Sequence, residues 1–330
     1  MNQTKIDAVV DELDQKTQSV GSLIDFVKSN DIEKVSTGYE KIDRLTGGLR
    51  FENTYLISGL EKSGKSSFIF KMITNWLKDH WKIGLINTEL SGEEVLIRLA
   101  ALTANKTLAE IEAKKDKLKK WIPKIEKYFF ATTPGQLVNK EGQIDFDVSL
   151  SKAEAFVEAG ARILIFDNLT TYGTQAGQKR GWEVLSNCVT RITNFAKQKN
   201  VLCLIVIHTK PDTVFSDTPG FIRKIIEDNE PEKMFSKSAT IVRRPSLSDV
   251  YGGGGCLSQL SGAFLVWRPF QKFNDPSFKE MTLLILDSFR HSESGVDVEM
   301  VFNGSKGLLM ESDNEQLYQK GREVFAGQDD

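Results

Sequence analysis

Short apolar runs alternate with amphipathic helical patterns along most of the chain. Apolar runs of strand length predict buried strands at residues 55–59, 82–87, 128–131, 162–166 and 201–207. Patterns with a period near 3.6 residues lie between these runs and predict helices that begin at Lys65, Glu93, Ile144 and Gly181. This alternation is typical of an α/β fold, in which a mostly parallel, twisted sheet carries helices on both of its faces.

Three further apolar runs follow with little helical pattern between them, at residues 263–268, 281–286 and 296–302. We expect them to form a β-rich C-terminal extension of the same sheet. The main domain is therefore expected to span residues 35–310, after an N-terminal helical arm or linker at residues 1–34 and before a flexible acidic tail at residues 311–330.

Three segments depart from the alternating pattern. Residues 6–27 place apolar side chains at helical spacing, so this arm has to pack on the main domain or on a neighbouring subunit. The lysine-rich residues 114–127 are typical of a solvated helix face. An insertion at about residues 211–243 mixes proline, acidic and basic residues, and a loop of this length is usually functional or disordered.

The composition narrows the class of protein. The chain has 330 residues, 40% of them hydrophobic, and a net charge of −2, which leaves room for a narrow basic channel but argues against a broad nucleic-acid coat. Its three cysteines lack metal-ligand spacing, so we expect reduced thiols and no zinc site. No apolar run approaches a membrane span, and we expect a cytoplasmic protein, in the host cytoplasm if it is viral, with an organellar matrix as the alternative.

Residues 59–66 read Gly-Leu-Glu-Lys-Ser-Gly-Lys-Ser, between an apolar run and an amphipathic helix. This is the pattern of a phosphate-binding loop, whose backbone N–H groups and helix dipole attract phosphate. Lys65 would reach the β- and γ-phosphates, and the Ser66 hydroxyl would bind Mg²⁺. The residues expected to bind nucleotide in this segment are Gly59, Lys62, Ser63, Gly64, Lys65, Ser66 and Ser67.

Two acidic residues at strand ends complete a candidate hydrolytic site. Asp167 ends a buried apolar run and is our candidate for the Mg²⁺ shell, although a turn or helix N-cap would also explain it. Glu89 follows another run, at the edge where such sheets bind ligands, and would orient or deprotonate the attacking water. Together with the phosphate-binding loop, these residues indicate a nucleoside triphosphatase.

The order of these segments resembles the RecA-like core of hexameric replicative DNA helicases. The likeness is strongest to the helicase half of short-tailed-phage primase-helicases and to mitochondrial Twinkle, and more distant to DnaB. Besides the phosphate-binding loop, the likeness is carried by Ser36-Thr37-Gly38-Tyr39, Asn87-Thr88-Glu89-Leu90-Ser91, Ile207-His208-Thr209-Lys210, residues 244–261 and Phe289-Arg290-His291. Together these segments cover roughly residues 35–309, and their order makes the likeness specific.

The resemblance implies further site residues. His208 would sense the γ-phosphate, Arg290 would act as an arginine finger on the nucleotide of a neighbouring subunit, and Phe302 would stack on the nucleobase. A solvated arginine, a strand-end histidine and a core phenylalanine are the structural alternatives. The implied DNA-binding residues are Lys210, Arg243 and Arg244 with the backbone of Gly252, Gly253, Gly254 and Gly255, for which a plain turn is the alternative.

By the resemblance, the protein would be a replicative DNA helicase that uses ATP or a dNTP with Mg²⁺. A homo-hexameric ring would move along single-stranded DNA and unwind the duplex. A separate primase, polymerase and loader are the expected partners. Priming activity would reside elsewhere, since we find no zinc-binding module and no room for a primase domain. The alternatives are a recombinase or regulatory ATPase of the RadA or KaiC kind, and a nucleotide-switched loader or assembly factor.

Overall fold

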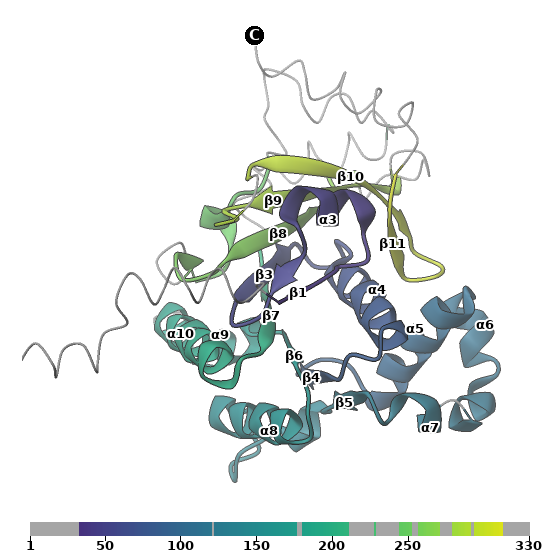
Figure 1. The fold of residues 1–330 in the computed structure, drawn as a ribbon, viewed down its shortest axis with the longest axis horizontal. Helices are drawn as coiled ribbons and strands as arrows, with labels where there is room; N and C mark the ends of the chain where they lie inside the picture. The colour runs from purple at the N-terminus through teal and green to yellow at the C-terminus, as the bar shows by residue number, and fades with distance from the viewer. Residues whose placement is uncertain are drawn as a thin grey trace, which may run out of the picture.

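Nine strands form one continuous sheet in the described part of the chain (Figure 1). The structure is a computed structural model that describes residues 33–120, 122–176, 180–210, 228, 244–252, 257–270, 279–291 and 294–312. The strands follow the order β11-β10-β9-β8-β3-β7-β6-β4-β5 across the sheet. Their bounds are β3 Thr54–Gly59, β4 Ile83–Asn87, β5 Phe129–Ala131, β6 Ile163–Asp167, β7 Leu202–His208, β8 Gly262–Trp267, β9 Met281–Asp287, β10 Val296–Asn303 and β11 Leu308–Glu311.

Six neighbouring strands of the sheet run parallel, namely β8, β3, β7, β6, β4 and β5. Strands β9, β10 and β11 extend the sheet in antiparallel fashion. Strands β3, β4 and β6 are buried along their whole length, which is why they read as continuous apolar runs. The expected α/β fold with a mostly parallel sheet and a β-rich C-terminal end is confirmed. Strand β8, which the sequence groups with the extension, completes the parallel part because it pairs with β3.

Helices cover both faces of the sheet (Figure 1). On one face, α4 (Lys65–Lys78) and α5 (Gly92–Ala104) bury residues such as Trp76. On the other face, α8 (Phe146–Glu158), α9 (Thr170–Gln175) and α10 (Gly181–Lys199) bury residues such as Val189. All of these helices except the short α9 begin within two residues of the starts that the periodicity predicts.

The lysine-rich residues 114–127 are not one solvated helix. After α6 (Leu108–Glu112) the chain forms the 3-10 helix η1 (Lys115–Lys120) and the single turn α7 (Ile122–Ile125). The lysines described at 114, 115 and 117 are exposed, as expected. Pro123 lies in the first turn of α7. Because proline disfavours a helical conformation in the residue before it, a continuous helix through residues 114–127 is unfavourable.

The entry segment of the described chain packs on its last strand. Strand β1 (Lys34–Val35) pairs with β2 (Leu49–Arg50), and α3 (Glu40–Thr46) lies between them in the sequence. The Tyr39 hydroxyl donates to the Leu309 carbonyl at 2.9 Å, and the Lys41 N–H donates to the Glu311 carboxylate at 2.6 Å. These bonds hold β11, and through it the β10–β11 hairpin, against the start of the domain.

Three expected segments lie largely outside the described residues. They are the arm at residues 1–34, the insertion at about residues 211–243 apart from Asp228, and the tail after Ser312. A search of the described helices finds none long and apolar enough to cross a membrane.

Candidate functional site

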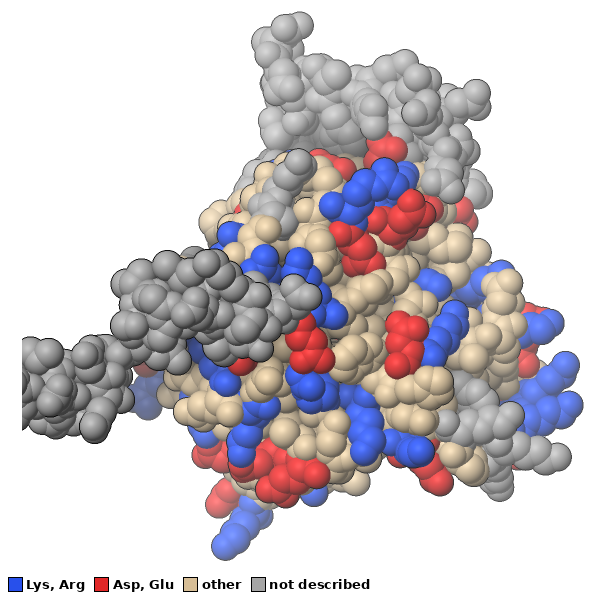
Figure 2. All heavy atoms as spheres, in the orientation of Figure 1, with Lys and Arg blue, Asp and Glu red and all other residues tan. Residues whose placement is uncertain are grey.

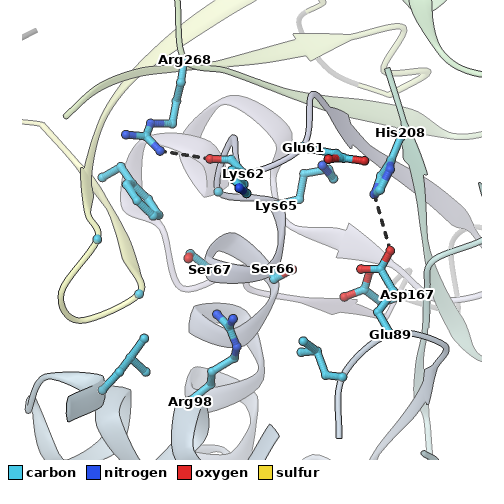
Figure 3. Close-up of a pocket in the computed structure, with 16 residues that line it drawn as sticks. Glu61, Lys62, Lys65, Ser66, Ser67, Glu89, Arg98, Asp167, His208 and Arg268 are labelled. Carbon is cyan, nitrogen blue, oxygen red and sulfur yellow. Dashed lines mark hydrogen bonds and ion pairs between the residues drawn. The ribbon is translucent and has the colours of Figure 1, made fainter. Parts of the chain in front are cut away.

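A cavity of about 610 Å³ opens where the parallel strands end, beside the N-terminus of α4 (Figure 3). Carboxyl ends of parallel strands meet at one edge of a sheet, so residues distant in the sequence converge there. Phosphate-loop residues, strand-end acids and two arginines contribute to its wall. The lining residues are Glu61, Lys62, Gly64, Lys65, Ser66, Ser67, Glu89, Leu90, Arg98, Leu108, Asp167, His208, Arg268, Phe302, Gly304 and Gly307.

The loop between β3 and α4 has the compact form that its glycines predict. A Cβ atom on Gly59 would lie 2.6 Å from the Ser63 hydroxyl, too close for any other residue type. Gly64 has a φ of +107° and precedes α4 directly, so the left-handed conformation at this turn favours glycine. The first turn of α4 therefore points its free N–H groups at the cavity, where an anion would be stabilised.

Lys65 is held inside this loop. Its Nζ donates to the carbonyl oxygens of Gly59 at 3.0 Å and Leu60 at 2.7 Å. Burial lowers the pKa of Lys65 to about 8, although the charges of Asp167 and Glu89 oppose this shift. The ammonium group therefore lacks a closely bound counter-charge, and a phosphate beside it would supply one.

Asp167 and Ser66 both line the cavity and carry oxygen atoms that could bind a metal ion. Burial raises the pKa of Asp167 to about 6, and the nearby Glu89 carboxylate contributes while Lys65 opposes. No group of three or more acidic, histidine or cysteine side chains in the described residues forms a metal cage. A hydroxyl and a carboxylate beside a phosphate-binding loop nevertheless fit Mg²⁺, which keeps several waters and takes other ligands from phosphates.

Glu89, Asn168 and His208 form a connected group at the end of β4, β6 and β7. The Asn168 amide donates to Oε1 of Glu89 and lies 3.3 Å from Nε2 of His208, while Nε2 and Oε1 are 4.0 Å apart. That distance alone would suggest an ion pair. Burial, however, lowers the pKa of His208 to about 4, with the charge of Lys65 adding to the effect. The ring is therefore neutral at pH 7, and the contact is between a carboxylate and a dipole.

Phe302 and Arg268 form the opposite end of the cavity. The Arg268 guanidinium lies over the Phe302 ring, 4.1 Å from its centroid, and donates to the Lys62 carbonyl at 3.1 Å (Figure 3). Phe302 also approaches Gly64, where an added Cβ would meet the ring at 3.3 Å. A flat arginine on an aromatic ring is a surface on which a nucleobase can stack.

Sequence reasoning missed two arginines of this cavity. Arg268 directly follows the buried strand β8, and a cation at the end of an apolar run was the available signal. Arg98 projects from α5 toward Ser66 and Ser67 (Figure 3), and its charge acts to lower the pKa of Asp167. Its signal was weaker, since an arginine on an amphipathic helix is usually solvated.

Arg290 does not lie in this cavity. Strand β9 runs antiparallel to β8, with Asp287 beside Ala263, so the residues after β9 lie next to the start of β8. Arg290 is exposed, its N–H donates to the Ser261 carbonyl at 3.0 Å and its guanidinium donates to the Ser258 carbonyl. The cavity lies at the other end of β8, about 20 Å away at 3.3 Å per residue.

The candidate DNA-binding residues are only partly described. Thr209 pairs with Val250 and the Lys210 N–H donates to the Asp249 carbonyl at 2.8 Å, which brings the end of β7 beside the segment that leads to Gly252. The Arg244 guanidinium instead pairs with Asp297 at 2.5 Å. The remaining candidates lie outside the described residues, namely Arg243, Gly253, Gly254 and Gly255.

The chain is similar to a known protein family and to several solved structures. The family model of the DnaB-like helicase C terminal domain matches residues 34–209. Among solved structures, one ATPase domain has a TM-score of 0.67 at 18% identity, over 91% of this chain and 99% of that chain. A DnaB-like replicative helicase, from a structure that describes its interactions with primase, has a TM-score of 0.67 at 19% identity, over 93% of this chain and 71% of that chain.

A KaiC-like protein, PH0186 of the archaeon Pyrococcus horikoshii OT3, has a TM-score of 0.52 at 11% identity, over 86% of this chain and 100% of that chain. At these identities the structural likenesses establish a RecA-like fold. The family match, in contrast, spans more than half of the 330 residues, including the phosphate-binding loop, Glu89, Asp167 and His208. The chain therefore belongs to the family of DnaB-like helicase C-terminal domains and carries a P-loop NTPase domain of that family.

Proposed function

We propose that this protein is the ATP-driven motor of a replicative DNA helicase, in which a ring of subunits moves along single-stranded DNA and separates the duplex ahead. The observation that carries the proposal is the separation of its catalytic groups. Lys65, Asp167 and Glu89 line one cavity at the C-terminal ends of the parallel strands. Arg290 lies near the N-terminal end of β8, at the opposite end of the strands. A subunit arranged in this way carries the cavity of one catalytic site on one face and the arginine for a neighbour's site on another.

Binding of a nucleoside triphosphate would begin at the phosphate-binding loop. Lys65 would exchange its two carbonyl acceptors for phosphate oxygens, while the first N–H groups of α4 bind the β-phosphate. Arg268 and Phe302 would hold the base. Ser66 and Asp167 would hold Mg²⁺, which neutralises phosphate charge when it is bound.

Glu89 is the proposed group that orients and deprotonates the attacking water. Its side chain is half exposed toward the cavity, and one carboxylate oxygen is held by Asn168. The second oxygen is then available to a water molecule near the terminal phosphate. Neutral His208 can donate one hydrogen bond to that phosphate without repelling Lys65, which supports its role as a sensor of the γ-phosphate.

Arg290 is proposed to complete the site of the neighbouring subunit. It cannot reach its own cavity across the length of β8, and it is exposed at the domain surface. A guanidinium supplied by a neighbour stabilises the charge of the transition state, an effect of roughly 10³ to 10⁵ in rate in other NTPases. Hydrolysis would then require assembly, and six subunits is the number that the resemblance implies.

Single-stranded DNA is proposed to contact the segments that follow β7 and Val250. Their backbone pairing brings Lys210 and Gly252 to one part of the domain surface. The net charge of −2 fits a narrow contact rather than a broad basic surface. The face in Figure 2 intersperses Lys and Arg with Asp and Glu. A narrow contact through phosphates still weakens as salt rises.

The test is the ATPase rate as a function of protein concentration, with and without single-stranded DNA, with mass photometry at each concentration. We expect the rate per subunit to rise as rings form and to rise again with DNA. Glu89→Gln should abolish this turnover while nucleotide binding remains. A slow rate from monomers that ignores DNA would contradict the motor and favour a nucleotide-switched loader or assembly factor.

The fold shared with a KaiC-like protein keeps a recombinase or regulatory ATPase as the second candidate. A forked-duplex unwinding assay separates it from a helicase. ATP-dependent strand separation supports the motor, whereas strand exchange without unwinding, or hydrolysis without either, supports the second candidate.

A further inference from the structure

Asn168 contacts both Glu89 and His208, which line the cavity, although Asn168 is not itself a lining residue. It directly follows Asp167 and is 1% exposed. We propose that Asn168 is a positioning residue, which directs the Glu89 carboxylate and selects the tautomer of His208. The proposal rests on the catalytic role proposed above for Glu89.

The orientation of the Asn168 amide follows from its partners. Its Oδ1 accepts from the backbone N–H of Thr171 at 3.1 Å and from the Thr171 hydroxyl at 3.3 Å. A backbone N–H can only donate, so this side of the amide must be the oxygen. The NH₂ group therefore faces Glu89 and His208, and a flipped amide would set an oxygen against the carboxylate.

The backbone of Asn168 is anchored as well. Its N–H donates to the Thr88 hydroxyl at 3.0 Å, and the Thr88 N–H donates to the Asp167 carbonyl at 2.8 Å. These bonds tie the end of β6 to the residue that precedes Glu89. Asn168 thus has a fixed place from which to act on a carboxylate that is itself half exposed.

The two amide hydrogens have distinct consequences. The first binds Oε1 of Glu89, which restricts the rotamers of a flexible side chain and leaves the other oxygen for water. The second points to Nε2 of His208, 3.3 Å away, which requires a lone pair on that nitrogen. The His208 proton then lies on Nδ1. Burial keeps the ring neutral, which is compatible with this arrangement.

Asn87 offers a matched comparison. It is equally buried, but its Oδ1 accepts from the backbone N–H groups of Glu89 at 3.2 Å and Leu90 at 2.9 Å. Asn87 therefore shapes the loop and makes no contact with the carboxylate or the histidine among the hydrogen bonds of the described residues. An amide with a purely structural role would, like Asn87, bind the backbone of the loop and leave the Glu89 carboxylate and His208 without a contact.

The experiment compares Asn168→Asp with Asn87→Asp in the full chain, without nucleotide or Mg²⁺. Asn168→Asp retains size and the Thr171 acceptor but replaces both donors with an acceptor. The chain has three histidines, so ring ¹⁵N shifts report His208 after assignment with His208→Asn. We expect Asn168→Asp to move the His208 proton to Nε2, or to add one there, and Asn87→Asp to keep the wild-type tautomer.

Steady-state kinetics provide the second readout. We expect Asn168→Asp to lower kcat by about 10²-fold, as for a misplaced catalytic group, with less than a threefold change in KM for ATP. If Asn168→Asp does not fold, Asn168→Ala should leave His208 as a mixture of tautomers. A wild-type tautomer in both variants, or a kcat no lower than that of Asn87→Asp, overturns the proposal.

The two proposals can fail separately. Wild-type hydrolysis by Glu89→Gln would remove the catalytic role of Glu89, whereas the His208 tautomer in nucleotide-free protein tests Asn168 directly. A changed tautomer with an unchanged kcat would reject Asn168 as a positioning residue for hydrolysis.

Discussion

At the scale of single residues, the lowered pKa of His208 makes the stability of the folded protein depend on pH. Burial lowers its pKa to about 4 in the folded protein, from an ordinary value of 6.5. As pH falls from 7, the unfolded chain therefore takes up this proton first, and stability that is present above pH 6.5 is lost down to about pH 4. The loss is at most about 3 kcal/mol.

Denaturation with urea at pH 7 and pH 4.5 checks this expectation. His208→Asn, which does not titrate, should lose less stability between the two pH values than the wild type. Equal losses in the two proteins would show that His208 takes up its proton in the folded state as readily as in the unfolded chain.

Phe302 is predicted to contribute to nucleotide affinity. With Arg268 stacked on its ring, it offers an aromatic surface at one end of the cavity. Phe302→Ala should raise the Kd for ATP by about tenfold, since aromatic and cation contacts of this kind contribute about 1 kcal/mol or more. Isothermal titration provides the measurement.

Phe302→Leu is the matched control, because it retains apolar packing against Gly64 but cannot stack. We expect it to bind ATP nearly as weakly as Phe302→Ala while unfolding at a temperature close to that of the wild type. Wild-type affinity in Phe302→Leu would assign Phe302 to the core alone.

The sequence indicated those site residues whose chemistry has a local pattern. Lys65 and Ser66 belong to a specific motif, Asp167 directly follows an apolar run and Glu89 lies two residues after another. The roles of Arg268 and Asn168 arise instead from contacts with residues more than 30 positions away. Such contacts exist only after the strands are placed side by side.

At the scale of elements, the N-terminus of α5 is predicted to support catalysis. Ser91 and Glu94 form a capping box there, with the Glu94 N–H donating to the Ser91 hydroxyl at 3.2 Å. Ser91→Ala should cost about 1 kcal/mol in free energy of unfolding. Because this cap begins two residues after Glu89, we also expect kcat to fall several-fold.

Thr107→Ala provides the control, since Thr107 and Glu110 form the same capping box at α6. It should cost a similar free energy with no comparable effect on kcat, measured by urea denaturation and ATPase assay. Equal kcat values for the two variants would show that the α5 cap does not contribute to hydrolysis.

Most elements could be predicted because burial on both faces leaves continuous apolar runs. Both ends of all eight predicted strands were right within one residue. The short elements α6, α7 and β11 were missed, since four or five residues carry too little periodicity. The place of β8 was also missed, because parallel pairing with β3 depends on the chain between them rather than on its own residues.

At the scale of the whole molecule, the proposed ring predicts that two inactive variants restore each other. Glu89→Gln lacks the base of its own cavity, and Arg290→Ala lacks the group offered to its neighbour. Mixed rings contain interfaces at which intact Glu89 meets intact Arg290. We expect a mixture to regain a measurable part of the wild-type ATPase rate, roughly tenfold or more above either variant alone, because the finger contributes about 10³ or more in rate.

Arg44→Ala is the matched control for a surface arginine, since Arg44 forms only an exposed pair with Glu40 among the described residues. It should be as active as the wild type alone and should not rescue Arg290→Ala beyond simple addition of rates. Absence of any rescue in mixed rings, confirmed as mixed by native mass spectrometry, would contradict a site shared between subunits.

By itself, the sequence determined the α/β class, the phosphate-binding loop and the resemblance to replicative helicases, because these depend on local periodicity and on motifs of adjacent residues. The tertiary structure decided which distant residues meet. Parallel pairing gathered Glu89, Asn168 and His208 at one edge of the sheet, while antiparallel pairing of β9 carried Arg290 to the other. Strand order and direction are properties of the assembled sheet, and no single segment encodes them.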